Sequence, residues 1–271
     1  MTDAPLTPEL PSVTDTSPAP EVPSVTGTPP ATELPPVTEA PLTPARPPVA
    51  DAPPRPLRGA GPVPAARPRP FDAVLTDLDG VIRFYDMSRL TALERAAGLP
   101  EGATAEIAFA PETDLPLMLG RIGKEEWVAA IASGLAEHRR LDPARGRELG
   151  LALAESGFRA DGTVVELLGR ARAHVPVSIV TNATPWLDDD LARLGLTGLV
   201  DDVVGSAALG LVKPDRRIYE LAAERVGAAV SRCLFVDDRQ ENVDAAVALG
   251  MTGVLYRRPD DLRAALAPLF A

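Results

Sequence analysis

The stretch Ala73-Val74-Leu75-Thr76-Asp77-Leu78-Asp79-Gly80-Val81 decides how the rest of the chain is interpreted. It begins as an apolar run of strand length and then places two carboxylates two residues apart, before a glycine. Side chains two positions apart in a strand point to the same side, so Asp77 and Asp79 are predicted to converge at its carboxyl end. Gly80 lets the backbone turn away. Because carboxylates this close repel each other, the pattern indicates a metal site or a nucleophile beside an acid, with a solvated Asp-rich turn as the alternative.

Residues 1–70 differ from the rest of the chain in composition. They hold 21 of the 30 prolines and repeat a Glu-Leu/Val-Pro-Ser/Pro-Val-Thr unit every 12 residues, starting at Glu9, Glu21 and Glu33. The period is too short and too rich in proline for a solenoid, and apolar residues are too few to offset chain entropy. We predict a disordered, extended tail resembling polyproline II. A specific docking peptide is the alternative, and its partner is unknown.

The remaining residues are numerous enough to bury a core, and they carry 22 basic and 31 acidic side chains, a net charge of −9. An acidic domain disfavours nucleic acid or an anionic membrane as a partner. A single cysteine, Cys233, excludes an internal disulfide and fits a reducing compartment. No signal sequence or membrane-spanning run is visible, so we expect a cytoplasmic protein.

Segments of helical and of strand character alternate along 71–271. After the first strand, residues 85–160 are predicted to form a small helical bundle, punctuated by glycine and proline. Farther on, short strands are predicted at 177–181, 202–204, 233–236 and 253–256, with helices at 163–173, 187–194, 218–226, 242–249 and 259–269. This alternation predicts an α/β fold in which helices cover both faces of a parallel sheet, and the helical bundle is an inserted subdomain.

Polar side chains follow the predicted strands at their carboxyl ends, where parallel sheets bind ligands. They are Asp77, Asp79, Thr181, Asn182, Lys213, Asp237 and Asp238. Taken singly, each has an ordinary structural explanation, such as a helix cap or a loop lysine. Their joint order at successive strand ends favours a single site. Carboxylate oxygens suit Mg²⁺, and lysine and threonine can hold phosphate oxygens.

These motifs resemble those of the haloacid dehalogenase-like hydrolase superfamily over 71–271. Asp77-Leu-Asp-Gly80 resembles the first motif, Thr181 the second, Lys213 the third and Asp237-Asp238 the fourth. The resemblance implies a Rossmann-like core at 71–84 and 161–271, with a helical cap of the first type at 85–160. The sequence is similar to the phosphatase branch, including sugar-phosphate phosphatases and the N-terminal phosphatase domain of epoxide hydrolases.

The resemblance further implies a phosphatase that depends on Mg²⁺ and acts on a small-molecule phosphate monoester. Asp77 is expected to be the nucleophile that forms an aspartyl-phosphate, and Asp79 the general acid and base. An acid at Asp79 favours phosphoryl transfer over dehalogenation, because an alkoxide leaving group needs a proton and a halide does not. Thr181, Asn182 and Lys213 are expected to bind the phosphate oxygens, and Lys213 also to orient Asp77.

The metal ligands implied by the resemblance are Asp77, the backbone carbonyl of Asp79, and Asp238, with Asp237 in a supporting role and Asn242 in the outer shell. Two other functions remain open: a phosphomutase of the same fold, and a scaffold that uses its proline-rich tail.

Further side chains have less specific roles. Arg83 and Tyr85 follow Gly80 and fit a flap that faces the substrate as well as they fit packing. Trp127 is favoured as a residue of the cap core, and His138 and His174 as surface residues.

Overall fold

The computed structural model describes residues 69–270, so the predicted tail lies almost wholly outside the described residues. Five parallel strands form one sheet in the order β5-β4-β1-β6-β7. They are β1 (Ala73–Thr76), β4 (Val177–Thr181), β5 (Asp202–Gly205), β6 (Cys233–Asp237) and β7 (Thr252–Leu255). The predicted parallel sheet is therefore confirmed, and β1, which Asp77 directly follows, lies at its centre.

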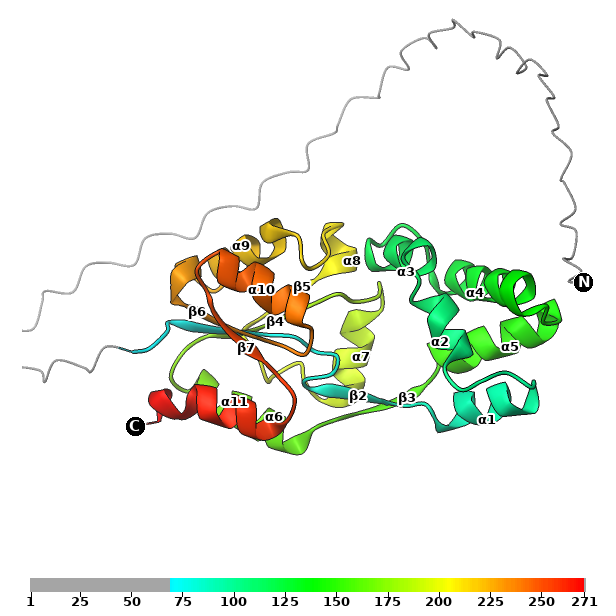
Figure 1. The fold of residues 1–271 in the computed structure, drawn as a ribbon. Helices are drawn as coiled ribbons and strands as arrows, with labels where there is room; N and C mark the ends of the chain where they lie inside the picture. The colour runs from blue at the N-terminus through cyan, green and yellow to red at the C-terminus, as the bar shows by residue number, and fades with distance from the viewer. Residues whose placement is uncertain (1–68, 271) are drawn as a thin grey trace, which may run out of the picture. The chain divides into compact units, whose positions relative to one another are not determined.

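Helices cover both faces of this sheet (Figure 1), as the alternating pattern predicts. They are α6 (Gly162–Arg172), α7 (Leu187–Leu194), α8 (Ser206–Leu209), α9 (Arg216–Arg225), α10 (Gln240–Ala248) and α11 (Pro259–Leu266), with 3₁₀ turns at Val230–Arg232 and Ala267–Leu269. Val74 of β1 packs in the core beneath α6 and α11, whereas Ala73 and Leu75 pack in the core beneath α9 and α10. Because both faces are buried, the strands are apolar throughout rather than alternating.

Five helices lie between the first and third strands of the chain. They are α1 (Ser88–Ala96), α2 (Ala103–Ala108), α3 (Pro111–Met118), α4 (Lys124–Arg139) and α5 (Pro143–Ala154). They enclose a hydrophobic core of their own, which includes Leu117, Ile131 and Leu149. α4 and α5 pack closely, because a Cβ on Gly150 of α5 would lie only 3.2 Å from the Val128 carbonyl of α4.

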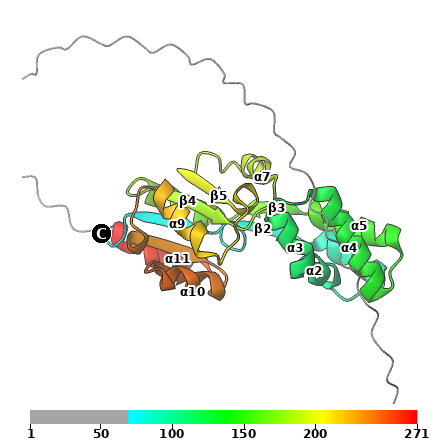
Figure 2. The ribbon, with the colours of Figure 1, turned by 90° about the horizontal axis from the view of Figure 1, so that it is seen from above.

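The helical prediction for 85–160 is wrong at both ends of that segment. β2 (Arg83–Asp86) and β3 (Gly157–Ala160) form a separate antiparallel ribbon, in which Tyr85 lies opposite Phe158. Their rings meet edge to face at 6.0 Å, a cross-strand pair that stabilises a short ribbon. Figure 2 shows both strands running between the sheet and the five helices.

Within residues 69–270 no helix combines the length and the apolar character that crossing a membrane would require.

Candidate active site

The sheet brings Asp77, Asp237 and Lys213 together at its carboxyl edge. Asp77 directly follows β1, Asp237 ends the neighbouring strand β6, and Lys213 lies in the loop before α9. Lys213 Nζ is 2.8 Å from Asp77 Oδ2 and 2.7 Å from Asp237 Oδ2. The other oxygen of Asp77, Oδ1, accepts a 2.7 Å hydrogen bond from the Leu78 N–H. Contacts with Lys213 and with the Leu78 N–H therefore fix the orientation of the Asp77 carboxylate.

The carboxylate of Asp238 lies close to those of Asp77 and Asp237. Oxygens of Asp77, Asp237 and Asp238 all lie within 4.8 Å of one another. Burial raises the pKa of Asp77 to about 7, and Lys213 opposes this rise more strongly than Asp237 adds to it. Burial, followed by the charge of Asp237, also raises the pKa of Asp238. The group carries more negative charge than one lysine balances, and such all-oxygen donors fit a hard divalent cation such as Mg²⁺.

Gly80 allows Asp238 to reach this group. Its φ of +74° lies in the left-handed region that favours glycine, and a Cβ there would collide with Asp238 Oδ2 and lie 2.7 Å from its Cγ. The glycine predicted to turn the chain after the strand therefore also makes room for a carboxylate from β6.

Asp237 is fully buried, and both of its oxygens accept hydrogen bonds. Oδ2 accepts from Lys213, Oδ1 accepts from the Arg239 N–H at 2.8 Å, and Asn242 Nδ2 lies 3.0 and 3.1 Å from the two oxygens. This carboxylate thus fixes Lys213 and the start of α10. Its predicted role as a supporting metal ligand stays a prediction, as does the outer-shell role of Asn242.

Thr181, the last residue of β4, and Asn182, which follows it, differ in their side-chain contacts. The hydroxyl of Thr181 is buried and has no hydrogen-bond partner among the described residues. The side chain of Asn182 instead binds the backbone of Lys213, accepting from its N–H at 2.7 Å and donating to its carbonyl at 3.1 Å. Sequence reasoning missed the contact between Asn182 and the Lys213 backbone, because no sequence pattern connects two residues so far apart.

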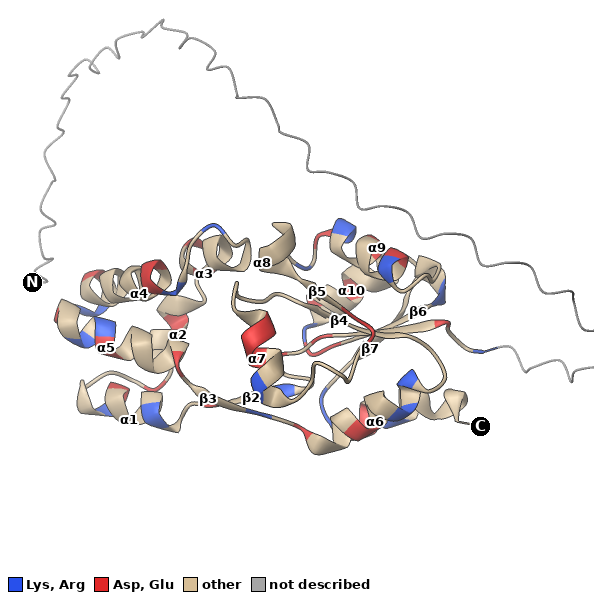
Figure 3. Cartoon of the chain, turned by 180° about the vertical axis from the view of Figure 1, so that it is seen from behind, with Lys and Arg blue, Asp and Glu red and all other residues tan. Residues whose placement is uncertain are grey.

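The carboxylate of Asp79 lies outside the three-carboxylate group. Arg83 donates to it twice, from Nε at 2.6 Å and from its second terminal nitrogen at 2.8 Å, and also donates to Asp190 of α7 at 2.8 Å. Arg83 is only 2% exposed. The spacing of four residues between Asp79 and Arg83 could have suggested their contact from the sequence. No sequence pattern suggested the contact between Arg83 and Asp190. Figure 3 shows acidic positions in red and a basic position in blue along the ribbon of α7, which carries Asp190 and Arg193.

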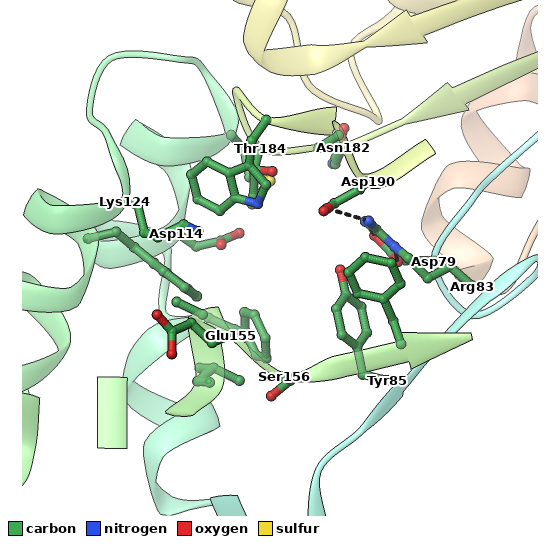
Figure 4. A pocket seen from close by; sticks show the side chains of 18 of the residues that line it. Asp79, Arg83, Tyr85, Asp114, Lys124, Glu155, Ser156, Asn182, Thr184 and Asp190 are labelled. Atoms are coloured by element: carbon green, nitrogen blue, oxygen red, sulfur yellow. Dashed lines mark hydrogen bonds and ion pairs between the residues drawn. The ribbon is translucent and has the colours of Figure 1, made fainter. Parts of the chain in front are cut away.

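A cavity of about 470 Å³ adjoins Asp79 and Asn182. Figure 4 shows Asp114, Lys124 and Glu155 on one side of it, and Asp190, Arg83 and Tyr85 on the other. Both residues of the possible flap therefore face the cavity. Trp127 belongs to the core of the five helices, as expected, and also lines the cavity. His138 and His174 are exposed, as predicted.

A parallel sheet with these groups at its carboxyl edge, and a helical insertion beside them, defines the class of α/β enzymes of the haloacid dehalogenase type. The family model for the haloacid dehalogenase-like hydrolases matches residues 71–250, and the chain belongs to this family.

Individual relatives agree with this assignment. The chain is 29% identical over 206 residues to phosphatase MT3486 of Mycobacterium tuberculosis, which covers 70% of this chain and 89% of that protein. Its fold is similar to that of the L-2-haloacid dehalogenase RSc1362, with a TM-score of 0.54 and 21% identity over 74% of this chain and 99% of the other. It is also similar to the family enzyme bt-2542 of Bacteroides thetaiotaomicron, crystallised with magnesium and inorganic phosphate, with a TM-score of 0.52 and 18% identity over 67% and 92% of the two chains.

Proposed function

We propose that this hydrolase is a phosphatase that depends on Mg²⁺ and cleaves a small phosphate monoester through an aspartyl-phosphate on Asp77. The observation that carries the proposal is the contact of Lys213 with Asp77 and Asp237, within reach of the Asp238 carboxylate. The name of the mycobacterial relative supports phosphoryl chemistry. The dehalogenase of similar fold supports the fold alone, and the acid at Asp79 favours a leaving group that needs a proton.

In the first step, an Asp77 oxygen attacks phosphorus, the bond between phosphorus and the ester oxygen breaks, and Asp79 gives its proton to the departing alkoxide. In the second step, water attacks the phosphorus of the aspartyl-phosphate, Asp79 takes a proton from that water, and the Asp77 carboxylate is released with inorganic phosphate. Lys213 orients Asp77 and offsets negative charge at both steps. The unpartnered hydroxyl of Thr181 is assigned to a phosphate oxygen.

Asp77, Asp238 and the backbone carbonyl of Asp79 would hold Mg²⁺, with Asp237 in support. When bound, the ion supplies positive charge that lets an anionic carboxylate approach an anionic phosphate. In the structure Arg83 holds both oxygens of Asp79, so proton transfer requires one of these hydrogen bonds to be given up. The cavity beside Asp79 provides the space for that movement.

The proposal divides residues 71–271 into a core at 71–84 and 161–271 and a cap at 85–160. It assigns the cap to substrate enclosure, because cap residues form one side of the cavity.

The test is hydrolysis of p-nitrophenyl phosphate and a panel of alkyl and sugar monophosphates by the full chain. We expect phosphate release with Mg²⁺, its loss in EDTA, and its return when excess Mg²⁺ is added. Absence of release from every ester, with and without metal, contradicts the proposal and favours the scaffold. Conversion of a sugar monophosphate to its isomer without phosphate release would assign a phosphomutase instead.

A further inference from the structure

Aromatic side chains are concentrated at the cavity beside Asp79. The whole chain has 11 aromatic residues, and five of them line this cavity. These five are Tyr85, Phe109, Trp127, Phe158 and Trp186, which include both tryptophans of the chain. The lining also includes Ser156, Asn182 and Thr184, but the five rings supply a large apolar surface, which indicates a ligand with an apolar surface of its own.

Two of the five rings are exposed, although aromatic side chains are rare in this chain. Tyr85 is 42% exposed and Phe109 is 54% exposed, and both belong to the small group of large apolar side chains that the described residues leave open. Tyr85 comes from β2 and Phe109 from the end of α2, so the two rings are supplied by different parts of the molecule. Exposed aromatic side chains at a cavity can stack on another planar ring.

The cavity wall also contains polar atoms that lack partners. Trp127 is only 5% exposed, and its indole N–H has no hydrogen-bond partner among the described residues. One carboxylate oxygen of Asp114 is likewise buried without a partner. A saturated alkyl chain would leave both groups unpaired, which is costly. A ring whose edge accepts from Trp127 or donates to Asp114 would satisfy them.

Three of the four cationic side chains that line the cavity lie against aromatic rings. Arg83 lies 5.0 Å from the centre of the Tyr85 ring and pairs with two carboxylates, and Arg193 lies 4.6 Å from the centre of Phe158. Lys124 Nζ lies 4.9 Å from the centre of the Trp186 ring. Cations that stack on rings and pair with carboxylates stiffen an aromatic wall. Arg83, which two carboxylates already hold, offers little to a second phosphate group.

We propose that the cavity binds the alcohol part of the substrate, and that this alcohol carries a planar aromatic or heteroaromatic ring with a hydrogen-bonding edge. The inference rests on the proposed phosphatase function. Asp79 and Asn182 connect the two regions, because both lie at the carboxyl edge of the sheet and also line the cavity. A phosphate held beside Asp77 would therefore place its ester group at the mouth of the aromatic wall.

The test compares esters of primary alcohols of similar acidity, so that the chemical step is alike. They are phenethyl, aminophenethyl, cyclohexylethyl, octyl and glycerol phosphates, each assayed with the full chain and Mg²⁺. We expect kcat/KM for phenethyl phosphate to exceed that for cyclohexylethyl phosphate about tenfold, because only the flat ring stacks. Aminophenethyl phosphate, which adds a donor for Asp114, is expected to be better still.

Variants separate the aromatic wall from general packing. Phe109→Leu is expected to lower kcat/KM for phenethyl phosphate, mainly by raising KM, and Asp114→Ala to remove the advantage of the amino group. Leu115→Ala is the matched control, because Leu115 is 42% exposed on α3 and does not line the cavity. An equal effect of Phe109→Leu and Leu115→Ala overturns the inference.

A binding measurement makes the test independent of turnover. Both tryptophans line the cavity, so intrinsic fluorescence reports its occupancy. With Mg²⁺ present, phenylpropylphosphonate is expected to change this emission at lower concentration than cyclohexylpropylphosphonate. Equal binding of the two, or a preference for octyl phosphate or glycerol phosphate in the assay, overturns this inference and leaves the phosphatase proposal standing. Ring-selective binding without hydrolysis of any ester overturns the phosphatase function and retains the ring site.

Discussion

At the scale of single residues, Gly80 shows how closely the acidic group is assembled. Its left-handed backbone and its contact with the Asp238 carboxylate are two separate demands for glycine. Gly98 has a nearly identical φ of +71°, but nothing lies within 4 Å of the position its Cβ would take. A side chain at Gly98 would therefore meet only backbone strain, whereas one at Gly80 would also collide with Asp238.

We predict that Gly98→Ala lowers the free energy of unfolding by about 1–2 kcal/mol, the cost of a left-handed conformation. Gly80→Ala is expected to lower the free energy of unfolding more, by about 3 kcal/mol in total, because Asp238 must move away. The same movement is expected to abolish hydrolysis that depends on Mg²⁺. Urea unfolding and Mg²⁺ titration of activity measure the two effects. Equal loss of stability and activity in the two variants would contradict the assigned role of Gly80.

Residue types at strand ends were predictable, but their contacts were not. Asp77 and Asp238 could be predicted because the carboxyl ends of parallel strands converge, whereas Lys213 lies beyond α8 in the loop before α9 and was predicted from its motif. The side-chain contacts of Asn182 and Asp237 depend on loop conformations that no local pattern specifies. The sequence therefore predicted which residues gather at the carboxyl edge of the sheet, but not that Asn182 and Asp237 hold Lys213 in place.

At the scale of elements, Arg83 links β2, the turn after β1, and α7. It is buried, and it pairs with Asp79 and Asp190. We predict that Arg83→Met lowers the free energy of unfolding by about 3 kcal/mol, because it removes the guanidinium partner of the buried Asp190 carboxylate and of the half-buried Asp79. The double variant Arg83→Met/Asp190→Leu should recover part of this loss. Urea unfolding measures both, and a single variant within about 1 kcal/mol of wild type would contradict the structural role of this ion pair.

The strands of the sheet were predictable from the sequence to within about one residue, because continuous apolar runs between turn residues are distinctive. β2 and β3 were missed because both are partly exposed and mix charged residues with aromatic ones, so neither contains a continuous apolar run. Their pairing joins segments more than 70 residues apart and depends on tertiary contacts rather than local preference. The helix α8 was missed because its four residues make a single turn, too short to show a helical period.

At the scale of the whole molecule, the described residues form hydrophobic cores that belong to different parts of the chain. The buried residues of the two cores beside the sheet come from residues before 85 and after 160, whereas those of the third come from 90–153. Trp186 is the residue after 160 that packs against this third core. The cavity lies where these parts meet, so sequence periodicity alone could not predict its lining.

We predict that unfolding in urea is not a single transition. Trp127 and Trp186, which both contact the core of the five helices, should report its unfolding by fluorescence. Far-ultraviolet circular dichroism should report the secondary structure of the whole chain and therefore give a midpoint that differs from the fluorescence midpoint. Coincident transitions by the two probes would show that the cores unfold as one unit.

The central claim is that Asp77 accepts the phosphoryl group, and the hydrolysis rate of Asp77→Asn with p-nitrophenyl phosphate and Mg²⁺ tests it most directly. Asp188→Asn is the matched control, because Asp188 is an exposed carboxylate on α7 outside the cavity lining. The account predicts that kcat falls on the order of 10³-fold or more in Asp77→Asn and stays at the wild-type value in Asp188→Asn. A wild-type rate in folded Asp77→Asn would contradict it.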